Sequence, residues 1–215
     1  NYDADMAKLV ALGVDGHSPD FIAVNVIPGF AEGIAKAYAL AKLNPRPPIA
    51  HAASSMRAFI VQELGDSYNG QEGIGNEVYR ADASGTKFAA DFTALTGAPP
   101  AGYDSSVYDA MVTNLLAVLK AALPLTDPTE VTPTQVKQAF SAINVPGAQV
   151  VRTGTDEFVK AIDAIAAGQD FNYEGASGPV DFGAVGDVRG NVALWKVENQ
   201  KFVTEFLWNC IDPPA

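Results

Sequence analysis

Short apolar runs alternate with amphipathic stretches over the first 64 residues of the chain. The run 21–27 is almost wholly apolar and β-branched, which predicts a strand buried on both faces, as in a parallel sheet, and 49–53 is a second short strand. Helical spacing predicts helices at 3–13, with Asp3 as N-cap, at 30–43, and from Ser54 or Ser55, as cap, to residue 64. This order of helices and strands is typical of an open α/β domain with a parallel sheet.

The pattern loosens between residues 65 and 102, where we expect a crossing between two parts of the fold and a short helix at 86–96. The strongest helical pattern follows at 105–123, with a continuous apolar stripe made of Val107, Tyr108, Met111, Leu115, Val118, Leu119 and Ala122. Two more helices are predicted, from Thr132 to residue 143 and at 155–167. The side chains of the last helix that are expected to face inward are Phe158, Val159, Ile162 and Ile165.

The final third of the chain is β-like. Val180 and Phe182 alternate with polar positions, and the runs 192–197 and 202–206 flank the short polar stretch 198–201. Two such runs around a short polar loop predict an antiparallel hairpin.

Composition excludes several partners. Hydrophobic residues make up 48% of the 215 residues, which is enough for a core, and the net charge is −11. This charge argues against nucleic acid, which is bound largely through Lys and Arg, and against an anionic membrane surface. No apolar run of about 18 residues exists to span a bilayer. The acidic start lacks the basic residues of a signal peptide, so any export signal is expected outside this chain.

Candidate catalytic groups are few. His17 lies in a polar turn and is expected to be solvated, whereas His51 ends a predicted strand and either lines a pocket or is a hydrogen-bonded group behind one. The single cysteine, Cys210, is read as a semi-buried apolar residue, with a bond to a cysteine outside the chain as the alternative. No metal-binding spacing of His, Cys, Asp or Glu is present, so no metal or cofactor is expected.

The stretch 175–178 reads GASG and superficially resembles a nucleophile elbow. The spacing G-x-S-x-G fails, and Pro179 to Phe182 leads into a strand rather than a helix. It also lacks the Gly-Lys-Ser/Thr ending of a phosphate loop. We therefore interpret this segment as structural, with glycines that permit positive φ in a tight turn, and expect no enzymatic activity.

Several motifs occur in the order known from one family. Residues 19–24 read PDFIAV, residues 108–111 read YDAM at the start of the long helix, and residues 173–182 read YEGASGPVDF. The last motif is followed by Gly186-Asp187 and then by Trp195-Lys196-Val197. Over the whole chain this order resembles the type I periplasmic solute-binding proteins, in the leucine/isoleucine/valine-binding branch of ABC-transporter receptors.

The resemblance implies an α/β fold of two open parallel-sheet lobes joined by a hinge. Family members are longer, and no strand precedes the first helix, so the resemblance implies that an N-terminal part is missing. Residues 1–77 correspond to lobe two without its first elements, and 78–190 to the C-terminal part of lobe one. Residues 191–215 correspond to a terminal hairpin that returns to lobe two.

The resemblance also implies a ligand site between the lobes, enclosed by a hinge motion. The contacts carried over by order are Ile27, Pro28, Gly29, Ala53 and Ser54 from lobe two, and the aromatic Tyr103 from lobe one. Amino-acid binders place an acidic residue after the second strand to pair with the ligand ammonium, but this chain has Ala53-Ser54-Ser55 there. A buried ammonium without a carboxylate is costly, so we expect a less polar or aromatic acid as ligand.

The function implied is that of an extracytoplasmic, periplasmic-type component of an ABC transporter. Its partners would be a small organic solute, a membrane permease and the missing N-terminal part, with no nucleic acid. One alternative is a ligand-sensing domain of a receptor or regulator, because a fold does not fix a function. A degenerate fragment that binds nothing is the other.

Overall fold

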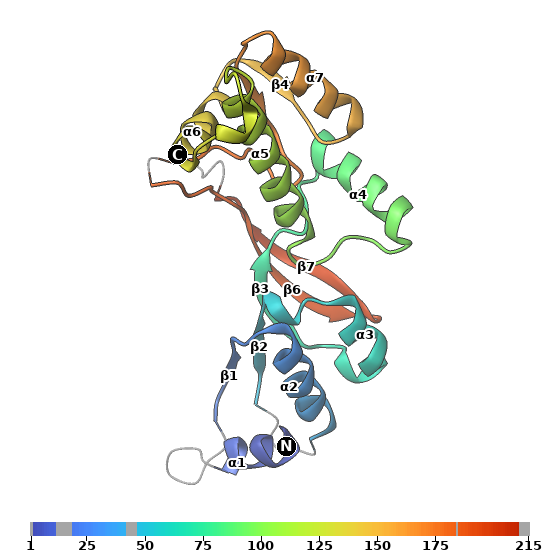
Figure 1. The fold of residues 1–215 in the computed structure, drawn as a ribbon. Coiled ribbons are helices and arrows are strands. Elements are labelled where there is room, and N and C mark those ends of the chain that lie inside the picture. The colour runs from blue at the N-terminus through green and yellow to red at the C-terminus, as the bar shows by residue number, and fades with distance from the viewer. Residues whose placement is uncertain (1, 12–18, 42–46, 184, 211–215) are drawn as a thin grey trace. The chain divides into compact units, whose positions relative to one another are not determined.

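The chain forms two compact units in the computed structural model, which describes residues 2–11, 19–41, 47–183 and 185–210. Unit 1 comprises Asn1–Asn76 and Asn191–Trp208, and unit 2 comprises Glu77–Gly190 and Asn209–Ala215. Each unit has its own sheet and its own core (Figure 1). The assignment of these units to the two lobes of a binding protein stays a prediction.

Unit 1 is built on a mixed five-stranded sheet in the order β1-β2-β3-β6-β7. Its elements in chain order are α1 (Tyr2–Ala11), β1 (Ile22–Val24), α2 (Pro28–Leu40), β2 (Ile49–Ala52), η2 (Ala53–Ser55), α3 (Ala58–Leu64), η3 (Gly65–Tyr68), β3 (Glu72–Asn76), β6 (Val192–Glu198) and β7 (Lys201–Trp208). The first three strands are parallel, whereas β6 and β7 run antiparallel to their neighbours. The predicted parallel sheet is therefore present, extended by the C-terminal hairpin.

One face of this sheet is buried under helices. The cross-strand row Val24, His51, Gly73 and Trp195 lies on this face, and all four residues are buried. The Trp195 ring lies so close over Gly73 that a Cβ there would be 2.3 Å from Cζ2. Farther along the face, residues of α1 and α2 pack against β1 and β2 in a cluster made of Met6, Ala37, Tyr38, Ile22, Val24 and Ile49. Helices thus cover the same face from β1 to β3.

The C-terminal hairpin confirms the predicted antiparallel pair, with a tighter loop than expected. Glu198 pairs with Lys201, so the loop is only Asn199 and Gln200, which have φ of 49° and 60°. Two-residue hairpin loops with positive φ at both positions match the right-handed twist of the flanking strands. The Gln200 N–H donates to the Asn69 side chain at 2.9 Å, which ties the loop to the residue that follows η3 in the same unit.

Unit 2 is mainly helical around a two-stranded parallel sheet. Its elements are α4 (Ala83–Thr96), α5 (Asp104–Ala122), η4 (Pro128–Glu130), α6 (Pro133–Ala139), η5 (Phe140–Ala142), β4 (Gln149–Val151), α7 (Thr155–Ala166) and β5 (Phe171–Tyr173). Strands β4 and β5 pair with each other. The core joins α5, α6, α7 and both strands, and its large buried side chains are Leu116, Ile143, Val151, Ile165, Phe171, Tyr173 and Val180.

The helices of unit 2 begin and end at the residues that local chemistry favours. Thr132 and Gln135 form a capping box before α6, and Pro133 occupies the first turn. The Asp82 side chain accepts from Gly85 N at the start of α4, and Gly97 ends this helix with φ of 77°. The predicted helices at 86–96, 105–123, 132–143 and 155–167 are all confirmed, although the third ends as the 3₁₀ turn η5.

Several boundaries in unit 1 differ from the sequence prediction. The strand expected at 21–27 is only Ile22–Val24, because α2 begins at Pro28, whose fixed φ suits the first helical turn. Ser54 and Ser55 do not cap a helix: they lie in η2, and Arg57 is the N-cap residue of α3. Asp3 lies inside the first turn of α1. His17 lies outside the described residues.

Three strands were not predicted. β3 carries Gly73 and Gly75, so it lacks the β-branched side chains that indicate a strand, and β4 and β5 have three residues each. The glycines of β3 are explained by the tertiary structure, because the Trp195 ring needs the space above Gly73. Burial was also misjudged, since Val159, Ile162 and Cys210 are exposed.

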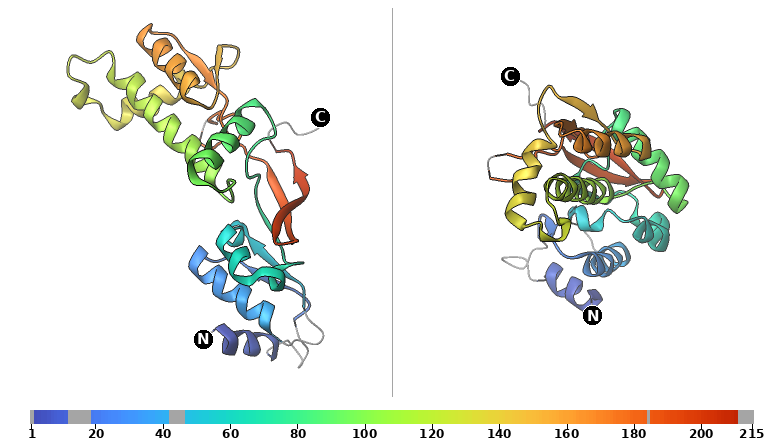
Figure 2. Two further views of the ribbon diagram at one scale, coloured as in Figure 1. Left: turned by 90° about the vertical axis from the view of Figure 1, so that its right-hand side faces the viewer. Right: turned by 45° about the horizontal axis from the view of Figure 1, so that its top comes forward.

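Helix α5 buries the side opposite to its apolar stripe. Its buried residues are Ser105, Asp109, Thr113, Leu116, Ala117 and Ala121. The large apolar residues of the stripe, such as Met111 and Leu115, are exposed on the other side of the helix. In Figure 2, right, α5 is seen nearly along its axis, with α6 beside it. The inner side of α5 packs against α6 and α7.

Candidate ligand-binding site

The predicted contacts of unit 1 follow two parallel neighbouring strands. β1 ends at Val24 and β2 at Ala52, so the residues after them meet at one edge of the sheet. Ile27 is the N-cap residue of α2, and Pro28 occupies its first turn. Ile27 and Gly29 are exposed, and a Cβ at Gly29 would meet no atom within 4 Å. Open α/β sheets bind ligands at this edge. Because Ile27 and Gly29 are exposed there, a ligand could reach both residues.

Ala53 and Ser54 lie at the same edge but beneath the surface. Both are buried in η2, directly after β2. Ala53 packs on β3, where a Cβ at Gly75 would lie 3.0 Å from the Ala53 Cβ. The Ser54 hydroxyl is buried and has no hydrogen-bond partner among the described residues. Their contact with a ligand stays a prediction, as does that of Ile27, Pro28 and Gly29.

His51 is a buried, hydrogen-bonded group of the sheet and does not reach the surface. Its Nε2 lies 2.7 Å from Gln71 Oε1, and its Nδ1 lies 3.1 Å from Ser55 Oγ. Because an amide oxygen only accepts, Nε2 carries the proton and Nδ1 accepts from the Ser55 hydroxyl. Burial lowers the pKa of His51, so the ring is neutral at pH 7. His51 is therefore the satisfied group behind the edge, and it offers no acid or base to a ligand.

The predicted aromatic contact, Tyr103, belongs to unit 2. It precedes α5 and follows Gly102, whose φ of 54° turns the chain into the helix. Its side chain is partly exposed, and its carbonyl accepts from Val107 N. Tyr103 is thus presented by the start of the long helix, on the other unit from the five predicted contacts.

The stretch 173–178 is anchored by Asp109, a residue to which the sequence analysis gave no role. Asp109 Oδ1 accepts from Tyr173 Oη at 2.9 Å and from Ala176 N at 2.8 Å. Its Oδ2 accepts from Ser177 N at 2.7 Å and from Ser177 Oγ at 2.6 Å. Burial raises the pKa of Asp109, while these four hydrogen bonds act in the opposite direction. The carboxylate fixes the turn to α5.

The glycines of this stretch serve two different purposes. Gly178 has φ of 130°, which a residue with a side chain rarely adopts. Gly175 instead makes room for a close approach, since a Cβ there would lie 2.5 Å from the Asp109 carboxylate. The Glu174 carbonyl also accepts from Ser84 Oγ at 2.6 Å. These contacts confirm the interpretation of the segment as structural, and positive φ explains only one of its two glycines.

Arg57 is a candidate that the sequence analysis missed. It follows η2, three residues after Ser54, and so lies at the carboxyl-end edge of the sheet. Its Nε is buried and has no hydrogen-bond partner among the described residues. An arginine guanidinium suits a carboxylate, to which it can donate two parallel hydrogen bonds.

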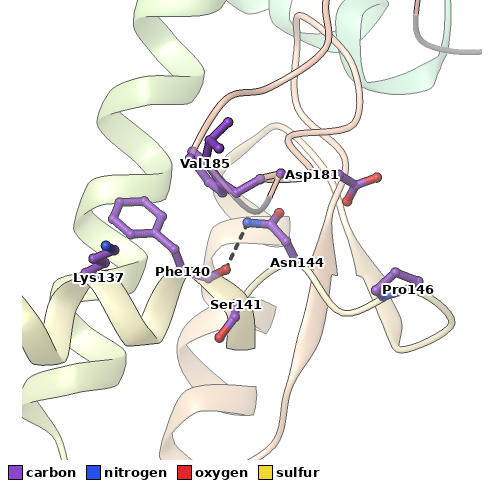
Figure 3. Close-up of a pocket in the computed structure, with 10 residues that line it drawn as sticks. Lys137, Phe140, Ser141, Asn144, Pro146, Asp181 and Val185 are labelled. Carbon is purple, nitrogen blue, oxygen red and sulfur yellow. Dashed lines mark hydrogen bonds between the residues drawn. The ribbon is translucent and has the colours of Figure 1, made fainter.

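Unit 2 has a cavity of about 550 Å³ between α6, η5 and the stretch after Val180 (Figure 3). Phe140 and Phe182 meet edge to face at its wall, with ring centroids 4.8 Å apart. Lys137 and Asp181 give it charges of both signs, so the lining selects no ligand charge. None of the six predicted contacts lines this cavity.

Two classes of site have no candidate in the part of the chain that the structure describes. No group of three or more His, Cys, Asp or Glu side chains is placed to hold a metal ion. No helix there is both long and apolar enough to cross a membrane.

This chain spans about half the length of each of three solved structures with the same fold. A leucine-binding protein from Thermotoga maritima superposes with a TM-score of 0.65 at 16% identity, covering 97% of this chain and 49% of that chain. An ABC-transporter solute-binding protein from R. palustris in complex with benzoate gives 0.63 at 18%, covering 96% and 46%. One from Rhodopseudomonas palustris with 3,4-dihydroxybenzoic acid gives 0.64 at 14%, covering 100% and 50%.

These likenesses confirm the fold predicted from the ordered motifs. At 14–18% identity they show the fold alone. No protein-family model matches the sequence, and neither does any curated protein sequence.

Proposed function

We propose that this chain, which has the fold of the type I periplasmic solute-binding proteins, is part of the solute-binding component of an ABC transporter. The carrying observation is the carboxyl-end edge of the unit 1 sheet, where Ile27 and Gly29 are exposed after a parallel strand. His51, the histidine nearest this edge in the sequence, is buried and hydrogen-bonded, which supports binding rather than catalysis. The ligand would sit between the two lobes and be enclosed by hinge closure, with Tyr103 contacting it from unit 2.

The proposed ligand is an organic acid without an ammonium group. No carboxylate stands among Ala53, Ser54 and Ser55 to pair with an ammonium. Arg57, with its unused Nε, supplies a positive charge at the same edge for a ligand carboxylate. The solved structures with bound benzoate and 3,4-dihydroxybenzoic acid agree with an aromatic acid, whereas others of this fold hold isoleucine or valine.

Calorimetry separates these ligand classes. We would titrate benzoate, 3,4-dihydroxybenzoate, leucine and glutamate into the protein carrying both lobes. Binding of the aromatic acids is expected, and Arg57→Gln should weaken it about tenfold or more, since a hydrogen bond to a charged group contributes about 1.5–3 kcal/mol. Arg152→Gln, an exposed arginine of unit 2, is the matched control and should change nothing. Tight binding of leucine or glutamate would refute the proposed ligand class.

A location outside the cytoplasm and a membrane permease as partner are part of the same proposal. Both come from the solved ABC-transporter components with this fold. Fractionation of the native cells tests the location, and chemical cross-linking to the permease tests the partner.

A further inference from the structure

Strand β7 ends the unit 1 sheet, and no described strand lies beside its outer edge (Figure 1). The direction of its backbone groups follows from Val197 of β6. The Val197 N–H donates to the Gln71 carbonyl at 2.9 Å, and the Val197 carbonyl accepts from Gly70 N at 2.8 Å, so both groups point away from β7. Phe202 is paired with Val197, so its own N–H and carbonyl point away from β6, as do those of Thr204 two residues later. The outer edge of β7 therefore offers two N–H donors and two carbonyl acceptors.

This edge lacks most of the features that usually protect an edge strand. Such strands are commonly short, interrupted by proline or lined with charged side chains. β7 instead has eight residues without a proline, and its large apolar side chains Val203, Phe206 and Trp208 are exposed. The irregularity in its pairing with β6 falls at Glu205. The stretch 201–204 is therefore a regular edge that another strand can join.

The side chains of this stretch are complementary to the same stretch read in the reverse direction. Lys201, Val203 and Glu205 alternate along the strand, so they lie on one face of the sheet. In an antiparallel pair of two β7 strands centred on Val203, Lys201 of each copy lies opposite Glu205 of the other. The same register sets Phe202 opposite Thr204, the two residues with outward backbone groups, and lets them exchange hydrogen bonds. Moving the centre to Phe202 or Thr204 places Lys201 opposite an apolar side chain, so neither alternative pairs the charges.

The charges of this face fit such a pair. Lys201 has no ion-pair partner among the residues that the structure describes, and Glu205 contacts Lys196 of its own copy. Opposite charges directly across two strands stabilise their pairing, whereas like charges destabilise it. The two-fold relation between the copies makes each Lys201–Glu205 pair occur twice.

We propose that β7 is a self-association edge, at which two copies of this chain pair antiparallel about Val203 and join their sheets. A reversed copy of the same stretch supplies both complementary charges and all the hydrogen-bond partners. Because each copy carries a net charge of −11 and the contact is short, the dimer should be weak. The inference goes beyond the proposed ligand site, because it concerns a different edge of the sheet and needs no ligand.

Charge reversal tests the pairing in sedimentation equilibrium of the 215-residue chain without ligand. The wild-type chain should dimerise at concentrations up to about 1 mM, as is usual for a weak interface. Lys201→Glu should raise the dimer Kd about tenfold or more, because two attractive pairs become two repulsive ones. Lys137→Glu, at an exposed lysine of α6, makes the same change in net charge and should leave the Kd within about twofold.

The reciprocal variant makes this test specific. Glu205→Lys should also weaken the dimer, but an equimolar mixture of Lys201→Glu and Glu205→Lys chains should associate at least as well as wild type, because each introduced charge then faces its opposite. Circular dichroism of each variant checks that the chain is folded. A wild-type chain that stays monomeric, a dimer that ignores both variants, or a mixture that does not associate would overturn the proposal. A failure to bind any organic acid would leave these results unaffected.

Cysteine cross-linking tests the register. The single native cysteine, Cys210, is exposed and is first replaced by serine. Val203→Cys then faces its own counterpart at a spacing that a disulfide can span, so oxidation should give a covalent dimer. Leu207→Cys is the matched control, since Leu207 is 39% and Val203 37% exposed, and it should cross-link far more slowly because its counterpart lies eight residues away along the strand. Equal cross-linking of the two variants would overturn the proposed register.

Discussion

Replacing Asp109 by asparagine removes a buried charge from unit 2 and leaves the size of the side chain unchanged. The carboxylate accepts four hydrogen bonds, two at each oxygen, from Tyr173, Ala176 and Ser177. An asparagine that keeps the two bonds at Oδ1 turns its Nδ2 toward Ser177. The Ser177 hydroxyl can rotate to accept from that nitrogen, but the Ser177 N–H then faces another donor. The variant thus loses one backbone hydrogen bond outright and weakens the others.

The magnitude follows from this lost bond. A backbone N–H left unsatisfied costs about 1–3 kcal/mol, and hydrogen bonds to a neutral acceptor are weaker than those to a charged one. Relief of the burial of a charge, which raises the pKa of Asp109, acts in the opposite direction. We expect Asp109→Asn to lower the free energy of unfolding of unit 2 by about 1–3 kcal/mol at pH 7.

The positions of the tryptophans allow each unit to be followed separately. Both tryptophans, Trp195 and Trp208, belong to unit 1, so tryptophan fluorescence during urea denaturation reports on that unit. Far-UV circular dichroism includes the helices of unit 2. Asp109→Asn should therefore shift the dichroism transition to lower urea and leave the fluorescence transition in place.

The matched control is Asp163→Asn, which changes an exposed aspartate of α7. A dichroism midpoint that stays unchanged in Asp109→Asn, or an equal shift in both variants, would refute the role given to Asp109.

The pH dependence adds a second criterion. An acid whose folded pKa is raised binds more protons when folded, so its contribution to stability is lost as pH rises from the ordinary value of 3.8 through the folded value. The difference between wild type and Asp109→Asn should therefore grow as the pH is lowered from 7 into that window.

Two further predictions concern unit 1. Burial lowers the folded pKa of His51, so the folded state binds fewer protons than the unfolded state, and unit 1 should lose stability as the pH falls below about 6.5. In His51→Asn, the urea midpoint detected by tryptophan fluorescence should no longer depend on pH in this range. An unchanged pH dependence in this variant would contradict the prediction. Gly73→Ala should lower the free energy of unfolding of unit 1 by about 2 kcal/mol or more, measured from the same fluorescence transition, because the new Cβ would collide with Trp195. Gly29→Ala lies in helix α2 and its Cβ meets no atom within 4 Å, so it should not lower this free energy. Equal losses in the two alanine variants would refute the packing argument.

Local pattern predicted most of the helices because the signals that start and stop a helix lie within a few residues of each other. The capping box at Thr132 and Gln135 and the glycine after α4 are of this kind. The hairpin was found for the same reason, since its two strands are adjacent in sequence. β3 was missed because its glycines are required by Trp195, more than a hundred residues away.

The candidate site could be predicted in part. The edge at which it lies follows from the order of strands and helices, which the sequence shows. The burial of residues at that edge does not follow from this order. Ala53 and Ser54 lie beneath the surface because η2 packs on β3, a strand that was not predicted. Arg57 was missed because a single arginine after a strand carries no signal until its unused donor is seen.

The amino-acid sequence by itself determined the types and order of the elements, the resemblance to a fold and the scarcity of catalytic groups. These properties depend on residue identity and on short-range spacing. Only the tertiary structure decided which sides of the elements are buried. The spacing of apolar residues in α5 shows that its stripe can be buried, but burial needs a surface that packs against it. Unit 2 provides such a surface only to the opposite side of the helix, which carries Asp109, Leu116 and Ala117. The same limit applies to the second face of the unit 1 sheet, where Ile74 and Phe206 are exposed. The alternation of side chains along a strand separates its two faces, but only the packing of other elements decides which face is covered.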